Sequence, residues 1–290
     1  MSAFLIAGLI FFYSLQSLFQ KFYNDRYPGR ADLSSPVFCV AESLAIALVT
    51  LAFSGFHVTF SIPTITIGLM NAAALYLYNI SIMRAGSLGS YAFLNVAMLF
   101  GGILVPMVYS IFLLDEIPTL LQFAAIGAML VSFLLMNWED IRMKGTKPIY
   151  YGFCLLLFLA NGLYGTFIKM QSVVNEEEST EMIILTYLVM GLIAFTTLAS
   201  KEKKNTLKAF RMDKKCLLWL AACLLVASLA INALVYVMPM VNAVVFYTVE
   251  AGGVLALAAL YAVVFFKERP SKIKVIGLVL ACVSITVLSL

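Results

Sequence analysis

The chain has 290 residues, of which 63% are hydrophobic and 12% are charged, and its formal net charge at pH 7 is +4. The charged share is about half that of an average soluble domain, so a soluble globular protein is excluded and a membrane protein is predicted. Only helices and closed barrels satisfy their backbone hydrogen bonds in lipid, and the sequence lacks the alternating strands of a barrel. We therefore expect an all-α membrane protein that contacts the lipid bilayer and binds no nucleic acid.

Ten apolar runs follow one another, each near the length of about 20 residues that a helix needs to cross a bilayer. They lie at about residues 2–22, 36–54, 63–83, 88–112, 118–137, 148–170, 181–199, 215–237, 241–265 and 270–289. Prolines such as Pro36, Pro63 and Pro118 stand at the starts of runs. Proline is tolerated in the first turn of a helix, because the backbone N–H that it lacks would have no partner within the helix there. The first run has no basic segment ahead of it, and we expect it to be an uncleaved helix.

The basic residues predict the orientation, because cytoplasmic loops carry an excess of Lys and Arg. All Lys and Arg except Lys169 lie in or beside the connections on one side, which include KEKKNTLKAFRMDKK at 201–215. The other side carries the acidic stretch NEEESTE at 175–181. We expect the basic side to face the cytoplasm, so that both termini of this multi-pass cell-membrane protein lie outside.

A short sequence at the end of one apolar run recurs in the second half of the chain. LLDEIPT around Glu116 is matched by FFKERPS around Glu268, and the same shift aligns Tyr109 with Tyr261. Matches that regular predict an internal repeat of five helices.

Five is an odd number, so the second copy must enter the membrane from the opposite side. We therefore predict ten transmembrane helices arranged as two inverted five-helix repeats, residues 1–144 and 145–290. This arrangement is typical of secondary transporters, which expose a central site alternately to the two sides of the membrane.

The same features resemble the drug/metabolite transporter superfamily, EamA branch. They are the ten helices, the five-helix repeat and the glutamate turns LLDEIPT and FFKERPS, each followed by a helix with a glycine, Gly127 or Gly277. The resemblance covers the whole chain. It implies a central cavity lined by helices 1, 3, 4, 6, 8 and 9, and a solute drawn from amino acids, nucleotide sugars, drugs and other metabolites.

Two acids, Glu42 and Glu250, fall inside apolar runs. An ionised carboxylate in hydrocarbon costs about 3 kcal/mol on insertion scales, so such a residue normally faces a cavity or a partner. Glu250 lies near the predicted midplane and Glu42 nearer the cytoplasmic end of its helix. Desolvation favours the neutral form of such an acid, which suits a carboxylate that binds and releases a proton or a cation. The structural alternative is a glutamate paired with a nearby polar residue.

Polar residues line the helices that the resemblance assigns to the cavity. In the first helix they follow the i, i+3, i+4 spacing of a single helical face. The further substrate-binding candidates are Tyr13, Gln16, Asn79, Asn95, Asn161, Tyr164, Asn232 and Tyr247. Hydrogen bonding between helices, for about 1 kcal/mol or less, is the alternative role for each.

Four glycines are candidates for gating. Gly101 and Gly102 in the fourth run are answered by Gly252 and Gly253 in the ninth, and glycine permits either local bending or close helix packing. Glu116 is expected to cap or fix its turn. Lys169 lies near a helix end, where a lysine reaches the interface, and a gating role is the alternative.

The leading hypothesis is a secondary transporter of a small organic solute, cationic or zwitterionic, with proton coupling left open. The sequence has no GxxxxGK[ST] loop to bind ATP. Its single histidine, His57, and its five cysteines without CxxC spacing predict no enzyme, no metal site and no cofactor. Efflux of cationic drugs, and a membrane receptor or assembly protein, are the alternatives.

Overall fold

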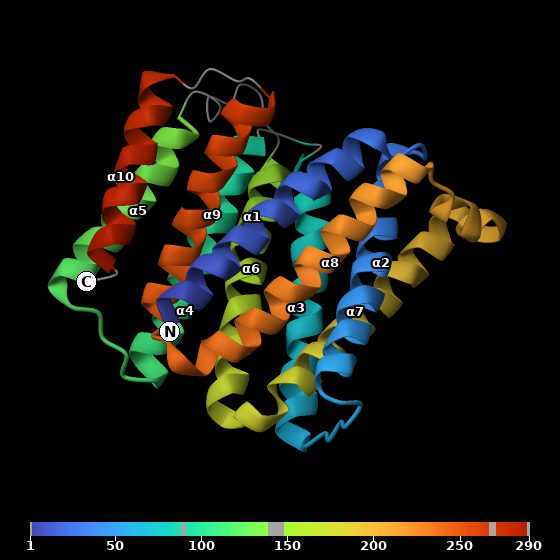
Figure 1. The fold of residues 1–290 in the computed structure, drawn as a ribbon, viewed down its shortest axis with the longest axis horizontal. Helices are drawn as coiled ribbons and strands as arrows, with labels where there is room; N and C mark the ends of the chain where they lie inside the picture. The colour runs from blue at the N-terminus through green and yellow to red at the C-terminus, as the bar shows by residue number, and fades with distance from the viewer. Residues whose placement is uncertain (1, 87, 89–90, 139–147, 267–270, 289–290) are drawn as a thin grey trace. The chain divides into compact units, whose positions relative to one another are not determined.

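The computed structural model describes residues 2–86, 88, 91–138, 148–266 and 271–288, and every regular element among them is helical (Figure 1). The ten α-helices are α1 (Ser2–Arg26), α2 (Ala31–Phe53), α3 (Ile62–Gly86), α4 (Tyr91–Leu113), α5 (Leu120–Met136), α6 (Pro148–Val174), α7 (Ser179–Glu202), α8 (Lys214–Val237), α9 (Ala243–Phe266) and α10 (Lys272–Leu288). Three 3-10 helices connect them: η1 (Glu176–Glu178), η2 (Lys203–Phe210) and η3 (Met238–Met240). The predicted all-α membrane protein is confirmed.

Eight of these helices are long and apolar enough to cross a membrane, judged by length and composition. The two others, α5 and α10, have 17 residues each, which at about 1.5 Å per residue gives roughly 26 Å. A bilayer core is about 30 Å thick. The multi-pass character is therefore shown, whereas ten membrane crossings in two inverted repeats remain a prediction.

Two prolines that were expected in the first turn of a helix lie elsewhere. Helix α2 begins at Ala31, so Pro36 lies inside the helix and not in its first turn. Helix α5 begins at Leu120, after Pro118, because Thr119 is its N-cap: the Thr119 hydroxyl accepts a 3.3 Å hydrogen bond from the N–H of Gln122. The Gln122 side chain accepts in return from the N–H of Thr119 at 2.9 Å. This reciprocal capping box satisfies two N–H groups that the helix cannot satisfy itself.

The chain forms two compact units. Unit 1 contains Met1–Ile10, Leu77–Lys169 and Met240–Leu290, and unit 2 contains Phe11–Tyr76 and Met170–Pro239. Helices α1, α3 and α6 therefore each contribute to both units. Both units draw on both halves of the chain, and the predicted repeat boundary after residue 144 remains a prediction.

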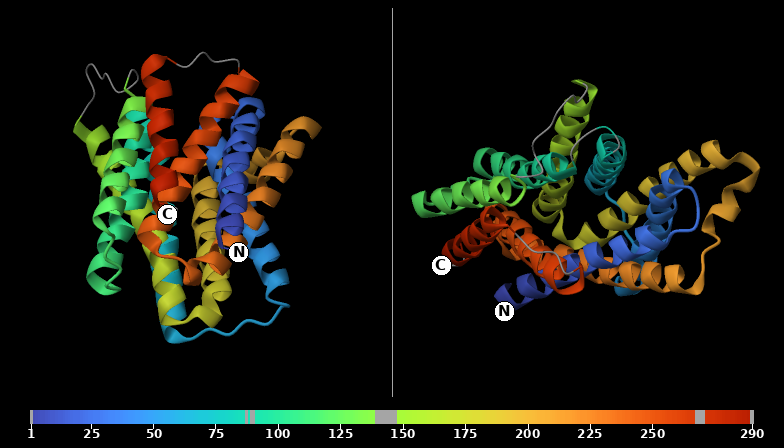
Figure 2. Two further views of the ribbon diagram at one scale, coloured as in Figure 1. Left: turned by 60° about the vertical axis from the view of Figure 1, so that its left-hand side comes forward. Right: turned by 90° about the horizontal axis from the view of Figure 1, so that it is seen from above.

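Unit 1 has an apolar core between α4, α5, α9 and α10. Met129 and Phe133 of α5 are buried there together with Val244 of α9. Helices α5 and α10 lie side by side in both views of Figure 2, and the Ser132 hydroxyl donates a 2.7 Å hydrogen bond to the carbonyl of Gly277. A Cβ at position 277 would lie 3.1 Å from the Ser132 carbonyl oxygen, so glycine allows this close approach.

Unit 2 has its core around α2, which packs against α7 and α8. Tyr23 and Phe38 are buried against Cys216 and Leu220 of α8. The Tyr23 hydroxyl donates a 3.1 Å hydrogen bond to the carbonyl of Ser34, so the polar end of this buried ring is satisfied. Cys216 of α8 and Cys39 of α2 are buried free thiols, and they pack as small apolar residues.

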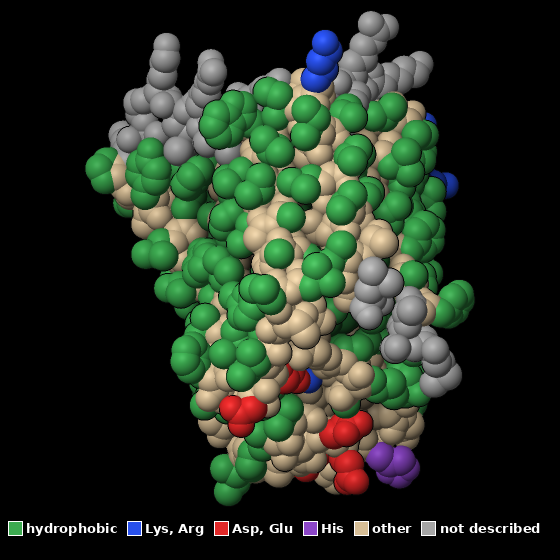
Figure 3. All heavy atoms as spheres, turned by 90° about the vertical axis from the view of Figure 1, so that its left-hand side faces the viewer, with side chains coloured by type: hydrophobic (Ala, Val, Ile, Leu, Met, Phe, Trp, Pro, Cys, Tyr) green, Lys and Arg blue, Asp and Glu red, His purple; other side chains and the backbone are tan. Residues whose placement is uncertain are grey.

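The outward faces of α5 and α10 are strongly apolar. Leu120 and Leu121 at the start of α5, and Ile276 and Val279 on α10, are among the exposed large hydrophobic residues. Figure 3 looks onto this side of the molecule, where hydrophobic side chains are spread over the upper and middle parts and acidic side chains gather in the lower part. Exposed apolar area on this scale is unusual for a soluble monomer and fits a surface in contact with lipid.

Candidate functional site

Glu250 lies in α9, seven residues after the first residue of that helix, Ala243. The rise of about 1.5 Å per residue places it roughly 10 Å along the helix axis. Its side chain is partly buried, and among the described residues none donates a hydrogen bond to its carboxylate or forms an ion pair with it. Within the described part of the chain, this carboxylate is therefore engaged by neither a side chain nor the backbone.

Tyr247 lies one turn before Glu250 on the same helix. Its ring is buried, with 8% of the side chain exposed, and its hydroxyl donates a 2.6 Å hydrogen bond to the carbonyl of Gly165 in α6. A Cβ at Gly165 would lie 3.0 Å from the Tyr247 ring. The contact joins α9 to α6, and glycine makes room for it.

The Asn161 side chain of α6 also makes a hydrogen bond to a neighbouring helix. Its side-chain NH₂ donates a 2.8 Å hydrogen bond to the carbonyl of Met98 in α4, and it would lie 2.8 Å from a Cβ at Gly102. Gly101 is closer still, because a Cβ there would collide with the backbone carbonyl of Phe158. Two of the four predicted gating glycines thus lie at a close contact of α4 with α6.

The middle of α4 also lacks one backbone hydrogen bond. Pro106 lies inside the helix, and a proline has no N–H to donate to the carbonyl four residues earlier, which here is that of Gly102. A helix is easier to bend where this bond is missing. The close packing of Gly101 and the missing bond at Gly102 lie next to each other.

The glycines of α9 face side chains and not backbone. A Cβ at Gly252 would collide with the end of the Met129 side chain, and one at Gly253 would lie 2.8 Å from the side chain of Ile10. The end of the Met129 side chain is flexible and can move aside, whereas Ile10 is β-branched and less free to move. Both positions are less constrained than Gly101, where the obstacle is backbone.

The remaining candidates of unit 1 lie on three helices. Asn79 of α3, Asn95 of α4 and Tyr164 of α6 are all partly buried. Asn79 and Tyr164 have interactions within the protein. Among the described residues, by contrast, Asn95 has no hydrogen-bond partner for its amide. Of the predicted site residues of unit 1, Asn95 and Glu250 are therefore the two whose polar atoms have no partner among the residues that the structure describes.

Four predicted residues belong to unit 2. The Gln16 side chain donates a 3.0 Å hydrogen bond to the Glu42 carboxylate, so the structure brings two of the candidates together. The Asn232 side chain donates to the Thr50 hydroxyl at 3.0 Å, and Tyr13 also interacts within the protein. Glu42 thus accepts a hydrogen bond from another helix, as expected if its role is structural.

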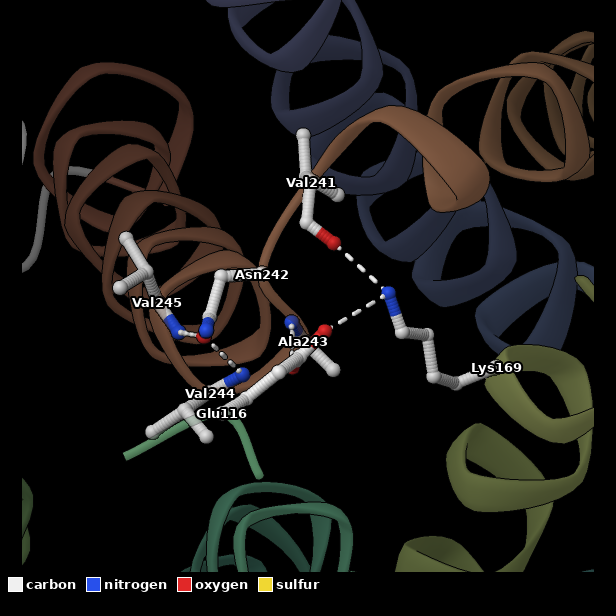
Figure 4. A network of polar contacts seen from close by, with 7 residues as sticks. All are labelled: Glu116, Lys169, Val241, Asn242, Ala243, Val244 and Val245. Atoms are coloured by element: carbon white, nitrogen blue, oxygen red, sulfur yellow. Dashed lines mark hydrogen bonds and ion pairs between the residues drawn. The ribbon is translucent and has the colours of Figure 1, made fainter. Parts of the chain in front are cut away.

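A polar cluster that the sequence did not predict joins α4, α6 and α9 within unit 1 (Figure 4). The Lys169 ammonium lies 3.2 Å from the Glu116 carboxylate and donates a 2.8 Å hydrogen bond to the carbonyl of Val241. The second Glu116 oxygen accepts a 3.1 Å hydrogen bond from the N–H of Ala243. The Lys169 side chain is only 5% exposed and that of Glu116 is 21% exposed.

The cluster completes the capping of α9. Asn242 accepts hydrogen bonds from the N–H groups of Val244 at 3.0 Å and Val245 at 3.2 Å. Glu116 satisfies Ala243, so the free N–H groups of the first turn have partners, and a carboxylate there is also favoured by the helix dipole. The repeat counterpart of Glu116, Glu268, lies outside the described residues.

A second carboxylate caps a helix start in unit 2. Glu178 of η1 accepts hydrogen bonds from the N–H and the hydroxyl of Ser61, both at 2.8 Å, just before α3. The Gln171 side chain of α6 donates to the Thr64 hydroxyl of α3 at 3.0 Å. Sequence reasoning took the NEEESTE stretch only as a sign of orientation, because its contact with residues more than a hundred positions away has no local pattern.

Comparisons with known proteins support a transporter fold. Residues 148–290 match the model of the EamA-like transporter family. A crystal structure of a protein with 14% sequence identity superposes with a TM-score of 0.72, and the match covers 99% of this chain and 95% of that chain. At that identity the likeness concerns the fold alone. No curated protein matches the sequence.

Proposed function

We propose that this chain, whose residues 148–290 match the model of the EamA-like transporter family, moves a small cationic or zwitterionic organic solute across the cell membrane by alternating access. The family model covers the second half of the chain, and the family consists of membrane transporters.

The state of Glu250 is the observation that carries the proposal. The other acids just described have partners: Glu42 accepts from Gln16, Glu116 pairs with Lys169 and Glu178 caps α3. Glu250 has no such partner among the described residues. A carboxylate inside an apolar helix that has no partner in the described part of the chain is suited to bind an exchangeable cation.

The chemistry of the group limits what it can bind. A carboxylate accepts hydrogen bonds from an ammonium group and attracts its charge, so amines and amino acids fit, whereas a simple anion would be repelled. In the absence of solute, a proton can neutralise the same carboxylate. Competition between solute and proton for Glu250 would couple the movement of one to the other. The unengaged amide of Asn95 in α4 is a further group that can bind the solute.

The gating and the orientation belong to the same proposal. The sequence repeats, residues 1–144 and 145–290, are taken as the two halves that exchange roles, with the termini outside the cytoplasm. Helix α4 is expected to bend near Gly102, where Pro106 removes a backbone hydrogen bond. Gly252 and Gly253 are expected to allow the corresponding adjustment in α9.

Counterflow in proteoliposomes tests the proposal. Liposomes are loaded with one unlabelled amine, amino acid, nucleoside or organic acid, and uptake of the same labelled compound is followed. We expect counterflow of an amine or amino acid by wild type, loss of it in Glu250→Gln, and retention in Glu42→Gln, whose amide can still accept from Gln16. Counterflow of organic acids that persists in Glu250→Gln would contradict the proposed solute class. Absence of counterflow for every class would contradict transport.

A further inference from the structure

The Glu116–Lys169 cluster joins three segments that are far apart in the sequence. Glu116 follows α4 and Lys169 lies in the last turns of α6. Val241 lies in the connection before α9, and Ala243 is the first residue of α9 (Figure 4). Lys169 contacts both of the other segments through one ammonium group, since it reaches the Glu116 carboxylate and the carbonyl of Val241. One side chain therefore links the end of α6 to the segment that follows α4 and to the segment that leads into α9.

Because the Glu116–Lys169 pair is largely buried, removing either member alone is expected to be costly. Removing one member of a buried ion pair leaves the other charge uncompensated and is far more costly than removing both. The Lys169 side chain is 5% exposed, whereas that of Glu116 is 21% exposed. The Lys169 ammonium is thus the charge that water cannot readily hydrate when its partner is removed.

A second contact lies one helical turn further along the same faces. Gly165 precedes Lys169 by four residues in α6, and Tyr247 follows Ala243 by four residues in α9; residues four apart lie on one side of a helix. The Tyr247 hydroxyl donates to the Gly165 carbonyl at 2.6 Å. The two contacts together fix the position of α9 along and around its axis relative to α6, and Glu250 follows three residues after the second contact.

We propose that Lys169 is a positioning residue, which with Glu116 clamps the outer end of α9 to α4 and α6 and thereby sets the position of the Glu250 carboxylate. The functional significance rests on the proposed function, because Glu250 is the group that would meet the solute there. The contacts of Lys169 with Glu116 and Val241 do not depend on which solute is bound.

Labelling of carboxyl groups tests the clamp without a known solute. Dicyclohexylcarbodiimide is an apolar reagent that adds to protonated carboxyl groups in membranes to give a stable N-acylurea, which mass spectrometry assigns to a residue. The ratio of the labelling rates of Glu250 and Glu42 is measured in wild type, Lys169→Met, Lys169→Arg and Glu116→Gln. Glu178→Gln is the matched control, since it removes a carboxylate that caps the start of a helix in unit 2.

We expect Lys169→Met and Glu116→Gln to raise the ratio about tenfold, which corresponds to about 1.4 kcal/mol, and Lys169→Arg to stay near wild type. Glu178→Gln should leave the ratio unchanged. An unchanged ratio in Glu116→Gln would overturn the proposal even if Lys169→Met does not fold, and so would an equal rise in Glu178→Gln. Loss of counterflow in Glu250→Gln is measured separately, so failure of the clamp and failure of the proposed function are distinguishable.

Discussion

The hydroxyl of Tyr247 donates its hydrogen bond to the backbone carbonyl of Gly165, at 2.6 Å. The bond uses the polar end of a residue that the sequence placed beside the solute, and it joins α9 to α6. Glu250, three residues later, makes no such contact among the described residues. The two neighbours on α9 therefore have different roles in our account: Tyr247 holds the helix, and Glu250 binds the solute.

Replacing Tyr247 with phenylalanine separates these roles. Tyr247→Phe removes the hydrogen bond but keeps the buried ring, so we expect a loss of about 1 kcal/mol in stability. The affinity for the solute identified by counterflow should change by less than about tenfold, or 1.4 kcal/mol. Denaturant unfolding and a binding titration measure the two effects. Complete loss of binding with unchanged stability would instead place the hydroxyl in contact with the solute.

The close contact at Gly101 predicts a steric effect. A Cβ there would collide with the backbone of Phe158, which no rotamer change can move, so Gly101→Ala should lower stability by about 1–3 kcal/mol. Gly127 has no atom within 4 Å of a built Cβ, and Gly127→Ala is the control that should fold normally. The apparent melting temperatures of the two purified variants are compared, and that of Gly101→Ala should be the lower. Equal values would mean that α4 and α6 are not held this closely.

The orientation can be tested at two exposed positions, Glu177 in η1 and Lys208 in η2. In a variant without its five cysteines, we expect Glu177→Cys to react with an impermeant maleimide in intact cells. Lys208→Cys should react only after the cells are permeabilised, because the basic connections are expected inside. The reverse pattern would invert the predicted topology.

The helices could be predicted from the sequence because a membrane-spanning helix needs a long apolar run, which is visible without any tertiary information. Each of the ten predicted runs overlaps one helix, from α1 to α10. The expected places of two prolines were wrong. Pro36 lies within α2, where surrounding structure tolerates a proline, and the capping box of Thr119 with Gln122, not Pro118, begins α5.

The pairing of side chains was much harder to predict. Glu116 was expected to fix its own turn, but its carboxylate reaches Lys169 and the start of α9 at Ala243. Such contacts depend on which helices pack together, and hydrophobic periodicity carries no information about that. Gln16 and Glu42 were each predicted as site residues, yet their mutual hydrogen bond could not be read from their separation of 26 residues.

The most direct test of the central claim is a thermal-shift measurement on purified wild type, Glu250→Gln and Glu42→Gln. The compounds are amines, amino acids, nucleosides and organic acids, each at two pH values. A ligand that binds the folded state stabilises it by RT ln(1 + [L]/Kd). We predict that an amine or amino acid stabilises wild type and Glu42→Gln, more at the higher pH where fewer protons compete for Glu250, and does not stabilise Glu250→Gln. Equal stabilisation of all three proteins would show that Glu250 is not the solute-binding carboxylate.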